Sequence, residues 1–314
     1  MTELEILEGI RREMAAMPGH LGFYYKNLVT GFEYGIREEE IYGAASVIKF
    51  PLFLHVLAEC EKGNLSLDDR IVTEESDKVP SCGALNMFTG SIETDIRTVC
   101  RLMICLSDNT ATNRLIRYFG FEDIERGFAE MGLGKTRIRR KLFDRAAAAQ
   151  GKQNSISPKE LGVLLEKLYR GEYINKEVSD YAIEVLSEQQ IGHKLAGKLG
   201  ENVQIAHKTG EDDGLSNDIG IVYADQPFVI CFTGHDTDVY PWEDLMRRST
   251  YDLYFANVAE AEKICRKSGA ILSGITDEIN DIAASDTDDI IIEDEKIIED
   301  YEQLLGDALK ERGN

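Results

Sequence analysis

The sequence predicts an α/β (α+β) fold in which an antiparallel sheet is flanked by helices and an all-α lobe is inserted into the chain. Two observations lead to this prediction. Runs rich in β-forming residues occur near both ends of the chain, and the segment between them shows helical periodicity. A length of 314 residues with 43% hydrophobic content allows one large domain or two lobes around a sizeable core.

The N-terminal region is predicted to contain a helix followed by a β-hairpin. Thr2 and Glu5 match a capping box, and the amphipathic helix that they begin should end before Pro18. The runs 21–28 and 32–36 are rich in β-forming residues and are separated by a short turn. This pattern predicts that they pair as a hairpin.

The rest of the chain divides into a helical middle and a strand-rich end. Helices are predicted over 44–62, 96–106, 110–118, 124–131, 158–169 and 176–186. Strands are predicted over 203–208, 218–224 and 228–234, and a helix from about 242 to 267. We therefore expect residues 1–45 and 195–275 to form a discontinuous α/β lobe. Residues 46–194 should form the all-α lobe.

The charge of the chain is concentrated in an acidic C-terminal extension, residues 276–314. This segment holds 14 acidic and 3 basic residues, half of the total net charge of −22. Its apolar positions form one stripe, which predicts an amphipathic helix that docks on the body or mediates self-association. An acidic chain lacks the basic surface that nucleic acid or anionic membranes require, so we expect neither as a partner.

Cysteine usage and the N-terminus bear on cofactors and compartment. The six cysteines are scattered without a CxxC pair, which favours buried thiols over a disulfide framework or a zinc site. We expect no metal and no cofactor. The first residues lack a basic segment followed by an apolar one, so a cytoplasmic location is predicted.

Ser46-Val47-Ile48-Lys49 is the first motif with chemical content. On a helix, positions i and i+3 share a face, so the lysine amine can reach the serine hydroxyl. A partly buried lysine with a lowered pKa can act as the base that a serine nucleophile needs. Alone the pattern is weak, because it should occur by chance about once in a chain of this length.

Ser107-Asp108-Asn109 follows an apolar helix and is the second motif. Its serine could pass a proton to a leaving group, and Asn109 could orient a substrate amide. The alternative is an ordinary helix junction, in which Ser107 and Asp108 cap the next helix.

Lys208-Thr209-Gly210, at the end of a predicted strand, is the third motif. Lys208 and Thr209 could hold a substrate carboxylate, and Gly210 would allow a close approach to the backbone. The alternative is a strand that simply turns into a polar loop.

The three motifs together are far more specific than each alone. They occur in order, separated by 61 and 101 residues, each on the kind of element that the chemistry needs. In this combination, and in stretches such as 65–71 and 217–223, the sequence resembles the class A serine β-lactamases and related penicillin-recognising serine hydrolases. The resemblance covers residues from about 20 to 270 and implies a β-lactamase/transpeptidase-like fold.

The resemblance also implies roles for the motif residues. Ser46 would be acylated by an amide, lactam or ester carbonyl, Lys49 would take or relay its proton, and Ser107 would protonate the leaving nitrogen. The backbone N–H groups of Ser46 and Glu211 would form the oxyanion hole. The resemblance implies four further site residues. Asn109 would contact the side-chain amide of the substrate, and Lys208, Thr209 and Gly210 would surround the substrate carboxylate.

The chain departs from this pattern in the loop expected to supply the deacylation base. Members of this class use a glutamate there, whereas residues 139–158 contain a single acid, Asp144, and no glutamate. If Asn154 matches the family's loop asparagine, the glutamate position is Gln150, and an amide cannot accept a proton from water. Asp144 is then the possible substitute, and slow turnover of β-lactams is expected.

The residues after Gly210 depart as well. Glu211, Asp212 and Asp213 are acidic where many relatives place an arginine, and Arg247 or Arg248 would have to reach the site instead. Such acids should disfavour anionic substrates and favour neutral or cationic ones. Two other functions stay open: a penicillin-binding-type D-amino-acid peptidase, amidase or esterase, and a non-catalytic ligand-binding relative.

Overall fold

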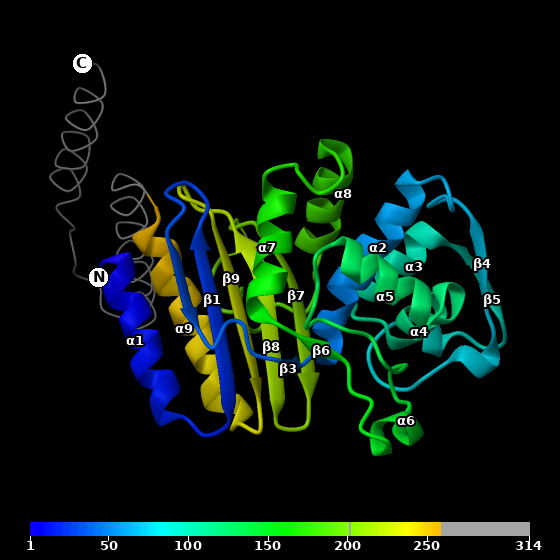
Figure 1. Cartoon of the computed structure of the whole chain (residues 1–314), viewed down its shortest axis with the longest axis horizontal. Helices are drawn as coiled ribbons and strands as arrows, with labels where there is room; N and C mark the ends of the chain where they lie inside the picture. The colour runs from blue at the N-terminus through cyan, green and yellow to red at the C-terminus, as the bar shows by residue number, and fades with distance from the viewer. Residues whose placement is uncertain (201, 259–314) are drawn as a thin grey trace, which may run out of the picture. The chain divides into compact units, whose positions relative to one another are not determined.

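The computed structural model describes residues 1–200 and 202–258 of the chain. A five-stranded antiparallel sheet with the order β2-β1-β9-β8-β7 forms its centre (Figure 1). The strands are β1 (His20–Asn27), β2 (Glu33–Ile36), β7 (Ile205–Asp212), β8 (Leu215–Val222) and β9 (Phe228–His235). Strands from both ends of the chain thus share one sheet, as the sequence predicted. The acidic extension 276–314, and the part of the last predicted helix beyond residue 258, lie outside the described residues.

Nine α-helices surround this sheet in the described part of the chain. They are α1 (Glu3–Ala16), α2 (Lys49–Glu61), α3 (Ile96–Cys105), α4 (Asn109–Phe119), α5 (Phe121–Glu130), α6 (Arg145–Ala149), α7 (Pro158–Tyr169), α8 (Lys176–Ser187) and α9 (Val239–Ala256). Two short two-stranded sheets accompany them, β3 (Tyr42–Gly43) with β6 (Ser155–Ile156) and β4 (Arg70–Thr73) with β5 (Ile92–Asp95). Among these described helices, none combines the length and hydropathy that a membrane span requires.

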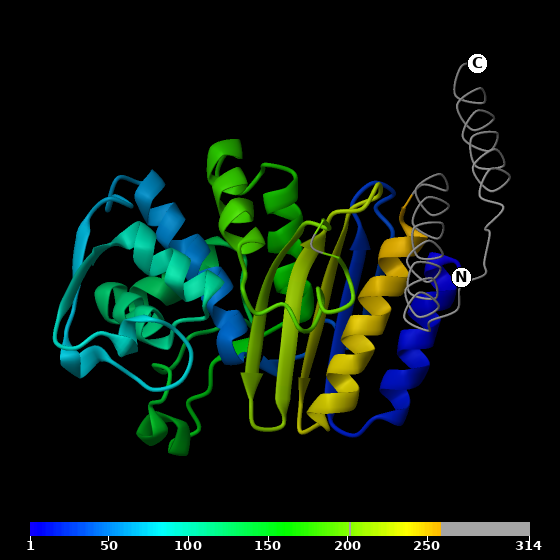
Figure 2. The ribbon, with the colours of Figure 1, turned by 180° about the vertical axis from the view of Figure 1, so that it is seen from behind.

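The sheet separates two hydrophobic cores. Helices α1 and α9 pack together on one face, where Phe23, Phe232 and Trp242 are fully buried. Helix α7 crosses the other face, and its core continues into the group formed by α2, α3, α4 and α5. Both views show this helical group beyond β7, at the end of the sheet away from β2 (Figures 1 and 2). The expected lobe boundary at residues 194–195 stays a prediction. Helices α7 and α8 precede this boundary in the chain, and both pack on the sheet.

Most predicted elements are present, and their boundaries show which local signals are weaker than pairing. The capping box at Thr2 and the hairpin of β1 with β2 are confirmed. Strand β7 extends to Asp212 instead of ending at Lys208, because Asp212 pairs with Leu215 across a tight turn onto β8. The third motif therefore lies within a strand and not at its end. Tertiary pairing has overridden the poor strand propensity of two consecutive acids.

Candidate active site

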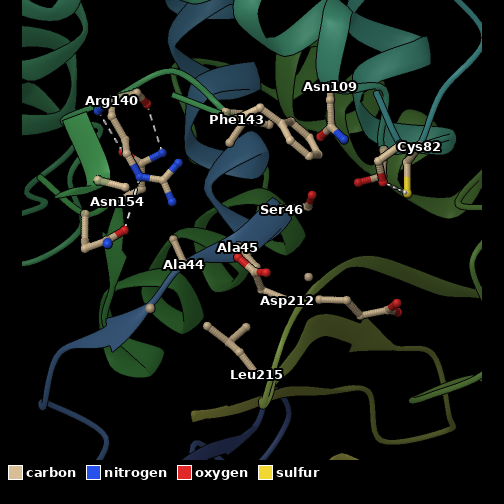
Figure 3. A pocket seen from close by; sticks show the side chains of 18 of the residues that line it. Ala44, Ala45, Ser46, Cys82, Asn109, Arg140, Phe143, Asn154, Asp212 and Leu215 are labelled. Carbon is tan, nitrogen blue, oxygen red and sulfur yellow. Dashed lines mark hydrogen bonds between the residues drawn. The ribbon is translucent and has the colours of Figure 1, made fainter. Parts of the chain in front are cut away.

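The three motifs meet at one cavity of about 720 Å³ (Figure 3). Ser46, Ser107, Asn109, Thr209 and Gly210 all line it. Its walls come from the start of the α2 segment, the junction between α3 and α4, the strand β7, and a loop that contains α6. Residues more than 150 positions apart in the sequence are thereby brought around a single serine.

Ser46 stands in a short 3₁₀ helix, η1 (Ala45–Ile48), which leads directly into α2. The preceding Ala45 has φ 41°, a left-handed backbone that is strained for a residue with a Cβ. The carbonyl groups of Gly43 and Ala44 accept hydrogen bonds of 2.9 and 3.2 Å from the side chain of Asn217 on β8. This clamp holds the strained segment in place, so the serine is presented at a fixed position beside the sheet.

Lys49 is fully buried, with its Nζ at the centre of the site. The Nζ lies 2.8 Å from Ser46 Oγ, 2.7 Å from the Ser107 carbonyl oxygen and 2.7 Å from Asn109 Oδ1. Burial, followed by repulsion from nearby Lys208, holds the pKa of Lys49 well below its ordinary value. The amine is therefore stabilised in its neutral form.

The neutral amine has the correct orientation for a base. It has two N–H groups and one lone pair, and both the Ser107 carbonyl and Asn109 Oδ1 are obligate acceptors. These two oxygens can take the two N–H groups of the neutral amine, so its lone pair can accept the hydroxyl hydrogen of Ser46 at 2.8 Å or that of Ser107 at 3.0 Å. Lys49 can thus accept the proton that Ser46 must lose as it attacks a carbonyl.

Ser107 links the two lysines of the site. Its φ of 53° is left-handed, which lets both its carbonyl and its hydroxyl face Lys49. Its Oγ lies 3.0 Å from Lys49 Nζ and 3.1 Å from Lys208 Nζ. Burial lowers the pKa of Lys208 to about 7. The hydroxyl of Ser107 therefore provides a route for a proton from Lys49 toward the cavity.

Asp108 confirms one half of the helix-junction interpretation of the second motif, since it caps α4, whereas the Ser107 hydroxyl contacts Lys49 and Lys208 instead. Its Oδ1 accepts the N–H of Ala111 at 2.9 Å and caps α4. Its Oδ2 accepts the N–H groups of Ala84 and Leu85 at 2.7 and 2.8 Å. Asp108 is thus structural, and it fixes the flanking Ser107 and Asn109 against the wall of the cavity.

Gly210 allows strand β7 to lie directly against the nucleophile. A Cβ at this position would come within 3.0 Å of the Ser46 nitrogen and 2.9 Å of the Val47 nitrogen. The carbonyl of Gly210 instead accepts a hydrogen bond from the buried Lys194 at 3.2 Å, on the side of β8. Because the C=O and N–H of a trans peptide point in opposite directions, the N–H of Glu211 faces the Ser46 side. This is the geometry expected of an oxyanion hole made by Ser46 and Glu211.

The loop 139–154 forms the remaining wall, and two buried asparagines hold it. Asn113 on α4 accepts the N–H of Leu142 at 2.8 Å and donates to its carbonyl at 3.0 Å. Asn154 accepts the N–H groups of Arg139 and Arg140 at 2.8 and 3.1 Å. These bonds hold Leu142, Phe143 and the first residues of α6 beside the cavity.

Gln150 and Asp144, the two positions predicted to bear on deacylation, differ in whether they line the cavity. Gln150 ends α6 and does not line the cavity, so it does not occupy the position of a deacylation base. Leu142, which does line the cavity, is the loop residue that Asn113 holds. Asp144 lines the cavity too, but its Oδ1 accepts the Ala147 N–H at 2.9 Å as the cap of α6. One of its two carboxylate oxygens is therefore used to hold the helix.

Glu211, His193 and Glu243 bring ligand-type side-chain atoms within 4.8 Å of one another near the cavity. Lys194 already pairs with both carboxylates of this group, with its Nζ 3.0 Å from Glu211 Oε1 and 3.8 Å from Glu243 Oε1. A cation would have to displace or adjoin a buried ammonium, so the group is best described as an ion-pair network.

Neither arginine proposed from the sequence reaches the cavity. Arg247 donates to the His193 carbonyl at 3.1 Å, and Arg248 pairs with Glu13 and Asp244.

Sequence reasoning missed three residues that support the site: Lys194, Asn113 and Asn217. They act through hydrogen bonds to the backbone of the third motif, of the loop and of the segment before Ser46, respectively. Asn113 lies four positions after Asn109, which places both on one helix face. Asn217 opens the stretch 217–223 on which the resemblance rests, whereas no local signal indicated Lys194.

Comparisons with known proteins identify the family of this chain. The model of the β-lactamase enzyme family matches residues 6–271. A curated β-lactamase of Rhodobacter capsulatus is 25% identical over 245 residues, which cover 76% of this chain and 83% of that protein.

Solved structures give the same result. PBP-A superposes with a TM-score of 0.73 at 27% identity, over 80% of this chain and 95% of its own. A β-lactamase of Sphaerobacter thermophilus gives 0.73 at 25% identity, over 79% and 95%. A variant of PBP-A is known as an acyl-enzyme complex with penicillin G, and it too gives a TM-score of 0.73 at 26% identity, over 81% and 96%. The family model spans most of the chain, and the fold is that of β-lactamases. The protein therefore belongs to the β-lactamase enzyme family.

Proposed function

We propose that this protein is a serine hydrolase that works through an acyl-Ser46 intermediate. The observation that carries the proposal is the contact between Ser46 Oγ and a buried Lys49 whose surroundings favour the neutral amine. A binding protein gains nothing from burying an amine at this position, because desolvating a lysine costs free energy. The arrangement instead fits the activation of a nucleophile.

Acylation follows from the contacts around Ser46. Its Oγ bonds to the carbonyl carbon of an amide, lactam or ester while Lys49 takes the hydroxyl proton, and the developing oxyanion accepts the N–H groups of Ser46 and Glu211. The C–N or C–O bond to the leaving group then breaks. The proton passes from Lys49 through the hydroxyl of Ser107 to the leaving atom, so charge and atoms balance.

The other motif residues bind the substrate. Asn109 keeps its Oδ1 on Lys49, so its amide N–H₂ is available for a substrate carbonyl. Lys208, when protonated, attracts a substrate carboxylate, which Thr209 can also contact because it lines the cavity.

Hydrolysis of the acyl-enzyme should be slow. The loop that faces Ser46 presents Leu142 and Phe143, and Asp144 is occupied as a helix cap. A water molecule next to the ester would therefore lack the general base that is typically worth about a hundredfold or more in rate. Such a site accumulates acyl-enzyme from β-lactams. The second candidate function is the transfer or release of a peptide-like acyl group.

Pre-steady-state kinetics with a chromogenic cephalosporin tests the proposal. The expected trace is a burst of one equivalent of product per enzyme followed by a slow linear phase, with no burst in Ser46→Ala. Fast linear turnover would contradict the slow second step. No burst with any lactam or activated ester, together with tight binding of the same compounds, would favour a non-catalytic relative.

A further inference from the structure

The cavity beside Ser46 has a positively charged side chain on one wall and a negatively charged side chain on another, and these two do not form an ion pair with each other. Arg140 belongs to the loop wall and Asp212 to the strand wall, and both line the cavity together with Ser46. Figure 3 shows the side chain of Arg140 extending from the loop near Ala44, and Asp212 on the strand below Ser46. Cys82 and Asn109 lie on the far side of Ser46 from Arg140 in this view.

Arg140 has only neutral partners among the residues that the structure describes. Its Nε donates to Gln153 Oε1 at 3.1 Å and its Nη1 to the Lys141 carbonyl at 3.3 Å. No described carboxylate pairs with it or with Arg145, the other arginine that lines the cavity, whereas most of the remaining arginines in the described ranges form an ion pair.

Asp212 is the matching case on the other wall. Its Oδ1 accepts the N–H of Asp213 at 2.9 Å, and within the described ranges no lysine, arginine or histidine forms an ion pair with it. The neighbouring Glu211 differs, because its carboxylate is bound by Lys194 at 3.0 Å. Asp144 is also without a described ion pair, with its Oδ1 capping α6, but it belongs to the loop wall, so Asp212 is the unpaired acid of the strand wall.

An unpaired cation and an unpaired anion that face the same cavity favour a ligand with the opposite arrangement of charge. Building on the function proposed above, we propose that the substrate carries a zwitterionic amino-acid head on its acyl side, with its carboxylate bound by Arg140 and its ammonium by Asp212. The guanidinium offers two parallel donors to such a carboxylate. The anchor formed by Lys208 and Thr209 is separate from this subsite and stays available for the leaving-group side.

The proposal is tested with two penicillins that differ only in the acyl side chain. One carries a phenylacetyl group, and the other an α-aminoadipyl group that ends in an ammonium and a carboxylate. The measured quantity is the ratio of their second-order acylation rate constants, from intact-protein mass spectrometry. The wild type should prefer the zwitterionic compound, and Arg140→Gln and Asp212→Asn should each lower the ratio by about tenfold, the usual effect of losing one charged hydrogen bond.

Two neighbours provide matched controls. Arg139 and Asp213 carry the same charges one residue away but do not line the cavity. Arg139→Gln and Asp213→Asn should therefore leave the ratio unchanged. A ratio that is the same in Arg140→Gln and Asp212→Asn as in the wild type would overturn the proposal. An equal fall in the control variants would also overturn it, because the preference would then be a general field effect.

Binding to Ser46→Ala separates this proposal from the function on which it rests. That variant lacks the nucleophile, so the affinities of the two penicillins, measured by isothermal titration calorimetry, report recognition alone. If no compound acylates the wild type but Ser46→Ala still prefers the zwitterionic compound, the zwitterion subsite stands and the acyl-enzyme function fails. Equal affinities in Ser46→Ala would refute the subsite whatever the chemistry.

Discussion

The state of Lys208 predicts a specific dependence of acylation on pH. Its pKa is lowered to about 7 by burial, whereas the role in carboxylate binding that we propose for it needs the charged ammonium. In the free enzyme about half of Lys208 is charged at pH 7, about a tenth at pH 8 and about a hundredth at pH 9. The second-order rate constant for a penicillin should therefore fall about fivefold from pH 7 to 8 and about tenfold from pH 8 to 9.

Lys49 determines the opposite limb of the same profile. It must be neutral to accept the Ser46 proton, and its pKa is held well below the ordinary lysine value. Acylation should therefore rise where Lys49 loses its proton and fall where Lys208 loses its own. Because this rate constant reports groups of the free enzyme, the profile should be bell-shaped for penicillins. A neutral ester without a carboxylate should show the rising limb and no comparable fall.

The assay is the rate of adduct formation from pH 5 to 9 under pseudo-first-order conditions, with Lys208→Arg as the matched variant. A guanidinium remains charged throughout this range, so the alkaline fall should disappear while acylation by the penicillin remains measurable. A flat wild-type profile between pH 7 and 9 would refute the reasoning. So would an identical alkaline limb in Lys208→Arg, because some other group would then control binding.

Three further predictions follow from the loop and the oxyanion hole. Leu142→Glu places a carboxylate at the cavity wall and should shorten the lifetime of the penicilloyl adduct by about a hundredfold. Gln150→Glu, outside the cavity, should leave the lifetime unchanged, and equal lifetimes in the two variants would contradict this assignment. Lys194→Met removes the ammonium that donates to the Gly210 carbonyl, so the acyl-ester C=O stretch should move to higher frequency in infrared spectra and acylation should slow by about tenfold. An unmoved band would show that Lys194 does not polarise the peptide between Gly210 and Glu211. Asn154→Ala removes three hydrogen bonds of a buried amide and should lower the free energy of unfolding in urea by about 2 kcal/mol, unless the loop contributes nothing to stability, in which case the midpoint will not change.

The parts of this protein that could be predicted from sequence are those with a local signature. The serine and lysine of the first motif lie one helical turn apart, and the structure places their reactive atoms 2.8 Å from each other. The hairpin of β1 and β2 and most helices follow from periodicity and capping in the same way.

Other features depend on contacts that no local pattern encodes. Lys194 supports the site through the carbonyls of Gly210 and Asn217, which become its neighbours only once β7 and β8 have paired. An alignment of the loop through Asn154 predicts that Gln150 takes the place of the family's loop glutamate. The position that faces the cavity, Leu142, is instead defined by Asn113 from a different helix. Long-range hydrogen bonds decide such placements, and a single sequence does not show them.

Locating an acyl group on Ser46 tests the central claim most directly. The protein is incubated with penicillin G, quenched, digested and analysed by tandem mass spectrometry, beside Ser46→Ala and Lys49→Met. The account predicts a stoichiometric penicilloyl group on the peptide that contains Ser46, long-lived in the wild type, absent from Ser46→Ala and strongly slowed in Lys49→Met. An adduct on another residue, or one that forms equally fast without Lys49, would contradict it.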